Sequence, residues 1–190
     1  MGLLSTALLL STLQLPLSAA FSPANRTELK AAVNKWVENR TEALITYGGP
    51  IGQWDVSAVD DMSMMFCGRN NDDCGCGDLC KHFQAFDDDL SGWDVSKVTS
   101  MHDMFIWASS FNQKLSRWNT SSVTNMQGMF NRAISFDQDI SSFNTASVTT
   151  MRGMFLGATS FNQDMTNFEI SAETITMDIF TGACMMEAKN

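Results

Sequence analysis

Four cysteines bring the most reactive side chains of the sequence into one short stretch. Cys67, Cys74, Cys76 and Cys80 are separated by 7, 2 and 4 residues. In an oxidising compartment, such a cluster in an otherwise cysteine-poor chain most often forms two disulfides, with three pairings possible. A zinc site helped by His82 is the rival interpretation, but the paired Cys-x-x-Cys spacing of many zinc sites is absent. The spacing therefore favours two disulfides that close a loop.

The cysteine-rich stretch is also acidic and rich in glycine. It carries Asp72, Asp73 and Asp78, and it falls where the chain has 14 residues more than its repeat needs. Insertions into repeat arrays project from one face and often bind partners, so these carboxylates form the candidate binding loop. Cys184 has no partner by count, and it is buried, reactive or intermolecular.

Other chemistry is poorly supported, and we expect neither an enzyme nor a cofactor. The only histidines are His82 and His102, and no nucleophile is paired with a base. Four Met-x-x-Met pairs offer soft ligands for Cu(I), but their alignment with phenylalanines favours a place in the core. These pairs are Met62/Met65, Met101/Met104, Met126/Met129 and Met151/Met154. Aspartates do not recur as a calcium ligand set, so no metal site is predicted.

A period of 25 residues organises most of the chain. Two aromatic series keep this spacing: Trp93, Trp118, Phe143 and Phe168, and Phe111, Phe136 and Phe161. A unit of this size cannot bury its own apolar face, so neighbouring units must stack and share one continuous core.

Each unit has two apolar runs. Val98, Met101, Met104, Phe105 and Ala108 are spaced 3, 3, 1 and 3, which suits one or two helical turns. The run from Phe111 to Leu115 is short enough for a parallel strand, but short apolar runs suit either structure, so which run is the strand stays open. The pattern therefore predicts an α/β, leucine-rich-repeat-like solenoid with short parallel strands and short helices.

Amide and carboxylate side chains recur directly after the second run. They occupy two adjacent repeat positions: Asn112, Asp137 and Asn162, then Gln113, Gln138 and Gln163. A stacked ladder that satisfies backbone groups in the turns is the favoured interpretation, and a polar binding row is the alternative.

The N-terminal region differs from the repeats. Residues 1–20 are predicted to be a signal peptide cleaved after Ala20, too short to span a membrane as a stable helix. Residues 21–50 are expected to form a capping helix and linker, with Asn25 or Thr27 as the N-cap. Residues 51–190 then form the repeats, with the cysteine-rich insertion at 67–83.

Net charge limits the partners. Twelve Lys and Arg against twenty-one Asp and Glu give a formal net charge of -9, which argues against nucleic acid. Asn25, Asn39 and Asn119 begin Asn-x-Ser/Thr sequons and are glycosylation candidates in a eukaryotic secretory pathway.

The repeat reads Trp-Asp-Val-Ser-x-Val-Thr-x-Met-x-x-Met-Phe, followed by Ala and Phe-Asn-Gln. Over roughly Trp54 to Ala183 this unit resembles the BspA-like leucine-rich-repeat surface proteins, a group that includes mycoplasma lipoproteins and algal secreted proteins. The resemblance implies a solenoid at a cell surface, with adhesion or host-protein binding and no general enzymatic activity. No cysteine for lipid attachment directly follows the signal segment, which puts lipid anchoring in doubt.

We therefore expect a secreted or cell-surface binding or adhesion module without catalytic activity. Its partner would be an extracellular protein or glycan, bound through the repeat face and the cysteine-rich loop. A structural wall or coat component is the alternative. A plastid location is the alternative if the source is an alga with a secondary plastid, because Ser18-Ala19-Ala20-Phe21 resembles the junction that directs proteins there. The oligomeric state is not predicted.

Overall fold

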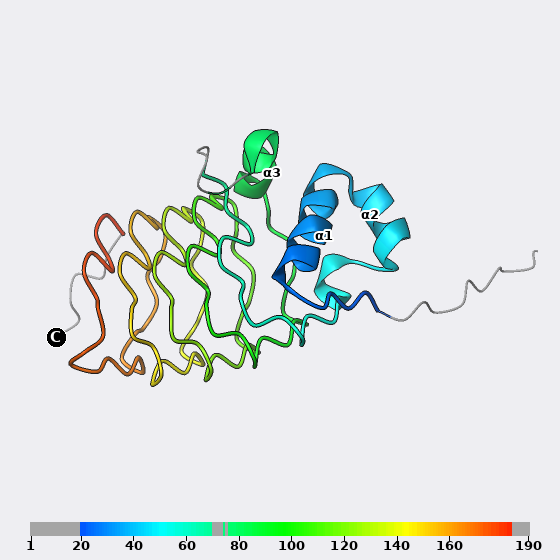
Figure 1. The fold of residues 1–190 in the computed structure, drawn as a ribbon. Coiled ribbons are helices and arrows are strands. Elements are labelled where there is room, and N and C mark those ends of the chain that lie inside the picture. Colours follow the sequence, from blue (N-terminus) through cyan, green and yellow to red (C-terminus); the bar gives the residue numbers. More distant parts are fainter. Residues whose placement is uncertain (1–19, 70–73, 75, 184–190) are drawn as a thin grey trace, which may run out of the picture.

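The computed structural model describes residues 20–69, 74 and 76–183. Two helices, α1 (Arg26–Glu38) and α2 (Arg40–Tyr47), precede the 3-10 turn η1 (Ile51–Gln53). The cysteine-rich insertion contains the 3-10 turn η3 (Gly77–Leu79) and the short helix α3 (Cys80–Gln84). The rest of the described chain winds through successive coils that lie side by side, with α1 and α2 at one end (Figure 1).

The prediction of an α/β, leucine-rich-repeat-like solenoid with short parallel strands and short helices is wrong. Within the described residues the repeats contain no strand, and the only helix after residue 53 lies in the insertion. Neighbouring coils meet at isolated parallel bridges that join Asp61, Ser100, Asn125, Thr150 and Ile175 in series. The repeats do stack, but as coils built of turns.

Left-handed backbone conformations explain why the first apolar run does not become a helix. Asp103 and Trp107 have φ values of 52° and 59°. A left-handed residue interrupts the hydrogen-bonding pattern of a right-handed helix, and it also ends an extended strand. The run from Met101 to Ala108 is therefore divided into single turns, closed by hydrogen bonds from Met104 N to Met101 O (3.2 Å) and from Ala108 N to Phe105 O (3.0 Å).

Side-chain hydrogen bonds replace the strand that the second run was expected to form. The backbone N–H of Asn112 donates to Asp87 Oδ1 (2.8 Å), and that of Asp137 donates to Asn112 Oδ1 (3.0 Å). The N–H of Asn162 donates in turn to Asp137 Oδ1 (2.9 Å). Each coil thus uses a side chain of the preceding coil as acceptor, so the row of amides and carboxylates is structural.

A second ladder connects the coils through backbone groups alone. We call residues 61–68, 100–107, 125–132, 150–157 and 175–182 the ladder segments. Alternate N–H groups of each segment donate to carbonyls of the next, as from Met101 to Asn125 (2.9 Å) and from Trp107 to Asn131 (2.8 Å), with four such bonds at each junction. These four bonds run in one direction, from each segment toward the C-terminal end of the stack. At the start of the segments one bond runs the other way, as from Ile175 N to Thr149 O (3.0 Å).

Phenylalanine rings form the centre of the core. Phe66, Phe105, Phe130, Phe155 and Phe180 stack in series with centroids 5.2 to 5.7 Å apart. A second series contains Phe86, Phe111, Phe136 and Phe161, with centroids 6.0 to 6.1 Å apart. The methionines of all four Met-x-x-Met pairs are fully buried beside these rings, as the core interpretation predicts.

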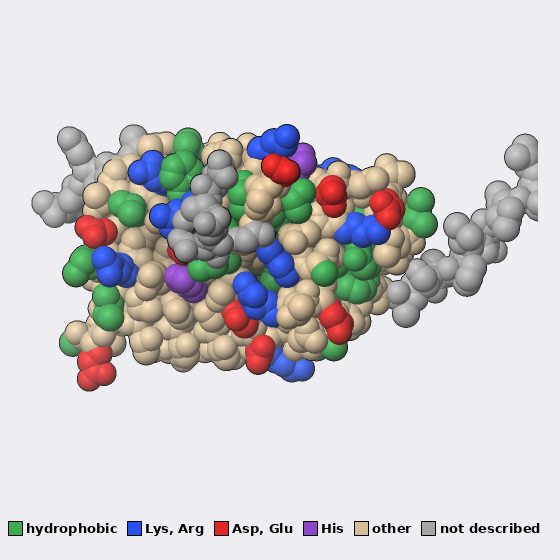
Figure 2. All heavy atoms as spheres, turned by 45° about the horizontal axis from the view of Figure 1, so that its top comes forward, with side chains coloured by type: hydrophobic (Ala, Val, Ile, Leu, Met, Phe, Trp, Pro, Cys, Tyr) green, Lys and Arg blue, Asp and Glu red, His purple; other side chains and the backbone are tan. Residues whose placement is uncertain are grey.

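The surface that carries α3 shows basic, acidic and hydrophobic side chains mixed together (Figure 2). The net negative charge of the chain is therefore not gathered into one acidic field on this face.

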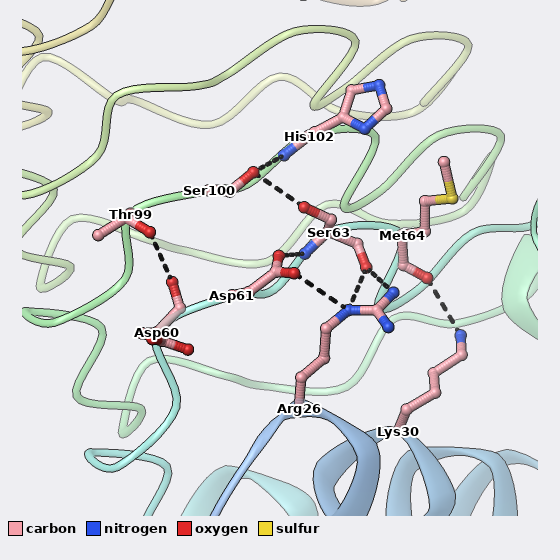
Figure 3. Close-up of polar contacts among 9 residues, drawn as sticks. All are labelled: Arg26, Lys30, Asp60, Asp61, Ser63, Met64, Thr99, Ser100 and His102. Atoms are coloured by element: carbon pink, nitrogen blue, oxygen red, sulfur yellow. Dashed lines mark hydrogen bonds and ion pairs between the residues drawn. The ribbon is translucent and has the colours of Figure 1, made fainter.

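Helix α1 covers the first coil with one apolar face and two cations. Its buried side chains are Leu29, Ala32, Val33 and Trp36, and the Asn25 side chain caps its N-terminus by accepting from Glu28 N. The Arg26 guanidinium donates to Ser63 O from Nε (3.2 Å) and Nη2 (2.6 Å). Lys30 Nζ donates to Met64 O (3.1 Å) and Met65 O (2.8 Å), as Figure 3 shows for Met64.

These two cations complete the ladder at its acceptor end. In every later segment, the carbonyls equivalent to Ser63 O and Met65 O accept from the preceding coil. The first coil has no preceding coil, so Arg26 and Lys30 provide donors for these two of its four ladder carbonyls. The predicted signal peptide lies outside the described residues except for Ala20, and the division at residues 20 and 50 stays a prediction.

The phenylalanine series makes a stability prediction. Phe130 is fully buried between Phe105 and Phe155, and its ring centroid is 3.9 Å from that of Phe136. Replacing it leaves a cavity in a core that cannot close without breaking the ladder. We expect Phe130→Ala to lower the free energy of unfolding by about 3–5 kcal/mol in urea denaturation. Ile134→Ala, at a 48% exposed site in the same coil, should change it by less than about 0.5 kcal/mol. Equal effects of the two variants would contradict this packing.

Lys30 makes the stability depend on pH. Burial, aided by the nearby charge of Arg26, lowers the pKa of Lys30 from 10.5 to about 8. Between these values the unfolded chain binds a proton that the folded protein has released, so stability should rise with pH, by at most about 1.4 kcal/mol per pH unit. The measurement is urea unfolding from pH 7.5 to 10.5. The rise should be absent in Lys30→Met, and a similar slope in both proteins would contradict the assignment.

Candidate functional site

The outward side chains of the ladder segments form a surface that we call the bridge face. It consists of two side chains from each segment, all half-buried or exposed: Asp61 and Ser63, Ser100 and His102, Asn125 and Gln127, Thr150 and Arg152, and Ile175 and Met177. These residues alternate with buried methionines that are the same in every unit but the last. Between them, the ten positions contain acidic, basic, amide, hydroxyl and apolar groups.

Hydrogen bonds fix the positions of the first side chains on the bridge face. The hydroxyl oxygens of Ser63 and Ser100 are 2.8 Å apart, and Asp61 Oδ1 accepts from Ser63 N (2.8 Å) (Figure 3). In the third coil, Asn125 Oδ1 similarly accepts from Gln127 N (2.9 Å). The bridging residues Asp61 and Asn125 are thus held by their own turns, and the Ser63 hydroxyl is held by Ser100 of the next coil.

An acid–base pair lies at the edge of this face. His102 Nε2 is 3.3 Å from Asp103 Oδ2. Burial raises the pKa of the Asp103 carboxyl, and the nearby charges of His102 and Arg69 oppose this shift. The Asp103 side chain lies directly over Gly128, where a Cβ would collide with Asp103 Oδ1. The glycine in the third coil therefore makes room for the aspartate of the second.

Next to this pair, Trp107 and Arg132 stack across adjacent coils. The guanidinium carbon of Arg132 is 4.7 Å from the centroid of the Trp107 ring. Both residues have positive φ, 59° and 56°, whereas the next two coils have Gly157 and Gly182 at this position. A left-handed conformation costs a side-chain-bearing residue about 1–2 kcal/mol relative to the right-handed one.

That strain, which Met64, Asp103 and Asp178 share, makes the Trp107–Arg132 pair a candidate for function. Side chains held in strained backbone conformations concentrate at functional sites, and Trp and Arg are the residues most enriched in binding hot spots. Sequence reasoning did not select this pair. The available signal was that one repeat position holds Trp107 and Arg132 in two successive units and glycine in the next two.

The insertion lies beside the same coil. Its cysteines form two local disulfides, Cys67–Cys74 and Cys76–Cys80, with Cα atoms 5.9 and 5.2 Å apart. The prediction of two disulfides is therefore confirmed, and the pairing is the sequential one. The cysteines of these pairs are consequently not available as zinc ligands together with His82.

Backbone contacts attach the insertion to the second coil. Gly68 N donates to Ile106 O (2.8 Å), and the Gln84 carbonyl accepts from Ser110 N (2.9 Å). The Gln84 side chain closes the base of the loop by donating to Gly68 O (2.8 Å). The insertion thus begins and ends next to Trp107, whose carbonyl contacts Gly68.

Of the three carboxylates in the predicted acidic binding loop, only one lies among the described residues. Asp78 is exposed at the start of η3, while Asp72 and Asp73 lie outside the described residues, as does Cys184. Within the described ranges, no group of three or more His, Cys, Asp or Glu side chains lies close enough together to hold a metal ion. In the same ranges, no helix is long and apolar enough to cross a membrane.

A polar hollow of about 370 Å³ lies on the side of the amide ladder. Its lining is Asp89, Ser91, Asn112, Gln113, Lys114, Ser116, Arg117 and Gln138. Asn112 and Gln138 are already committed to the ladder, since Gln138 Nε2 donates to Asn112 Oδ1 (3.0 Å). Hydrogen bonding to the Ser91 backbone N–H lowers the pKa of Asp89, so the hollow combines a carboxylate with two cations.

The three sequon asparagines are exposed, and each has a local structural role. The side-chain oxygens of Asn25 and Asn39 cap α1 and α2, and that of Asn119 accepts from Ser121 N (3.1 Å). These roles explain why asparagine occurs there without reference to a glycan, so glycosylation stays a prediction.

Comparison with known proteins gives one match. Residues 17–73 and 75–189 match the family described as "Mycoplasma protein of unknown function, DUF285". No curated protein and no solved structure matches the chain. The match agrees with the mycoplasma part of the expected resemblance, and the narrower BspA-like assignment stays a proposal. Because the matched residues include nearly all of the repeats, the chain belongs to the DUF285 family.

Proposed function

We propose that this protein is a non-catalytic binding or adhesion module that recognises a protein or glycan through the bridge face and the adjoining insertion. One observation carries the proposal. The coils keep the same buried residues and the same ladder, yet they present different side chains at the two outward positions of each ladder segment. A constant scaffold with a varied exposed row is the arrangement that repeat proteins use for recognition.

The scaffold holds this row at a fixed spacing. Four backbone hydrogen bonds at each junction set the register between neighbouring coils, and the stacked phenylalanines fill the space behind them. Side chains arranged on such a framework lose little additional entropy when a partner binds, which favours affinity. A partner would therefore contact the bridge face, from Asp61 to Met177, as one extended surface.

Trp107 and Arg132 are the proposed anchor of this surface. The ring supplies apolar area, and the guanidinium supplies donors for a carboxylate, a carbonyl or a sugar hydroxyl. His102 and Asp103 belong to the same ladder segment as Trp107, and the insertion is attached to the same coil. Around this point α3 and the neighbouring coils present a mixture of charges and hydrophobic groups (Figure 2). Such a mixture suits a protein or glycan better than a uniformly charged polymer.

The proposal includes a secreted or cell-surface location, which the sequence and the resemblance to BspA-like surface proteins support. An apolar N-terminal segment and two disulfides fit secretion or display at the cell surface, where the environment is oxidising. The alternative function, a wall or coat component without a specific ligand, would use the same stack for packing against other molecules.

Paired substitutions test the proposal. Trp107→Gly with Arg132→Gly removes both anchor side chains, and glycine suits the left-handed backbone at both sites. We expect the double variant to bind at least ten times more weakly than the unchanged chain to any ligand found by screening on arrays of glycans and extracellular proteins. A second variant combines Asp72→Ser, Asp73→Ser and Asp78→Ser. Its affinity for the same ligand reports whether the acidic loop contributes to binding.

Matched controls separate binding from folding. Ile134→Ala, an exposed change in the third coil, should bind as the unchanged chain does, and all variants should unfold cooperatively. Equal affinity of the double variant and the control would reject the anchor. Absence of any ligand, together with concentration-dependent self-association, would favour the wall or coat alternative.

A further inference from the structure

The last described coil leaves one edge of the backbone ladder open. In the preceding segment, the N–H groups of Met151, Gly153, Phe155 and Gly157 donate to carbonyls of residues 175–181 at 2.8–2.9 Å. The equivalent donors of the last segment belong to Thr176, Asp178, Phe180 and Gly182. None of these four N–H groups has an acceptor among the described residues. We call this row of four donors the terminal edge.

Apolar groups accompany the terminal edge. The Phe180 ring stacks on Phe155 with centroids 5.7 Å apart, and no further ring of the described chain covers its outer side. Ile175 and Met177 of the same segment are 54% and 59% exposed, although every earlier segment has polar residues at these positions. The edge therefore lacks a hydrogen-bonding partner and a hydrophobic partner at once.

At the other end of the stack, the edge of the first coil is covered by other parts of the chain. There, Arg26 and Lys30 donate to the exposed carbonyls of the first coil, and the apolar face of α1 covers its core. In the described chain no helix or set of charged side chains performs this role at the terminal edge. Exposed backbone edges of this kind are templates for added segments.

Hydrogen-bond polarity excludes a second copy of this chain as the partner. Two terminal edges brought together would place donors against donors. A head-to-tail arrangement would need the acceptor edge of the first coil, which Arg26, Lys30 and α1 already occupy. The partner must supply carbonyls at alternate residues of a separate segment.

We propose that the terminal edge binds a segment of another polypeptide that carries the repeat pattern Val-Thr-x-Met-x-x-Met-Phe and adds to the stack as a further ladder segment. Its alternate carbonyls would accept from Thr176, Asp178, Phe180 and Gly182. Its phenylalanine would cover the Phe180 ring. The mode corresponds to peptide addition at a sheet edge, with backbone groups giving affinity and the side chains giving specificity.

A peptide taken from this chain provides the probe. Residues 147–161 contain the carbonyls of Thr150, Arg152, Met154 and Leu156, which accept from the preceding segment within the stack. The whole chain would be titrated with this fluorescein-labelled peptide, and binding would be followed by anisotropy. We expect saturable binding, and binding at least ten times weaker for a peptide with alanine in place of Phe155. A scrambled peptide of the same composition is the control.

Amide hydrogen exchange locates the bound peptide on the unchanged protein. Exchange at residues 176, 178, 180 and 182 should be fast in the free chain and at least tenfold slower with saturating peptide. On the protein side, Phe180→Ala should weaken binding, whereas Ile170→Ala, at a 54% exposed site in the same coil, should not. The peptide variant keeps the test valid if Phe180→Ala disturbs the last coil.

Three results would overturn the proposal. One is no saturable binding, or equal binding of the scrambled peptide. Another is slow exchange of the four amides in the free chain, because the edge would then already be covered. The third is end-to-end association of the chain in sedimentation experiments that the peptide does not affect.

Discussion

The backbone ladder between successive coils is the constraint on which the rest of the structure depends. Alternate N–H groups of one ladder segment donate to carbonyls about 24 residues further along the chain, as from Met126 to Thr150 (2.9 Å). The register of this ladder decides which side chains are stacked. A shift of one residue would place polar side chains such as Gln127 where the buried Met126 lies. The 25-residue period is therefore a requirement of hydrogen bonding as well as of packing.

The ladder also gives the stack a direction. Because each segment donates to one side and accepts from the other, the two ends expose different chemical groups. Ser63 O and Met65 O would be unsatisfied acceptors at the first coil, and Arg26 and Lys30 satisfy them. The low pKa of Lys30 is a consequence of this position, since an amine that reaches buried carbonyls must leave water. The helices at the N-terminal end are thus required by the polarity of the ladder.

Much of the internal organisation was predictable from the sequence. The period, the burial of the Met-x-x-Met pairs, the two disulfides and the structural role of Asn112 and its equivalents all follow from spacing and composition. The secondary structure was not predictable in this way. Apolar spacing of 3, 3, 1 and 3 is the same for a helix and for a chain of single turns, and the choice depends on left-handed residues. At Gly128 and Gly153 glycine hints at that choice, whereas Asp103 and Trp107 give no such signal.

The candidate site was missed for the same reason. Trp107 and Arg132 look like ordinary surface residues until the backbone shows that glycine would suit their positions better. In a regular array, most side chains are explained by the ladder or by the core, and both recur from coil to coil. Trp107 and Arg132 break the repetition at a cost in backbone energy, although Gly157 makes the same ladder bond at the same position of the next coil. Trp107 is half-buried and packs against the core with part of its ring, and Arg132, stacked on it from the next coil, is exposed, so part of both side chains is open to a partner. The anchor role proposed above would account for this cost, because side chains at these two positions add contact area that glycine lacks.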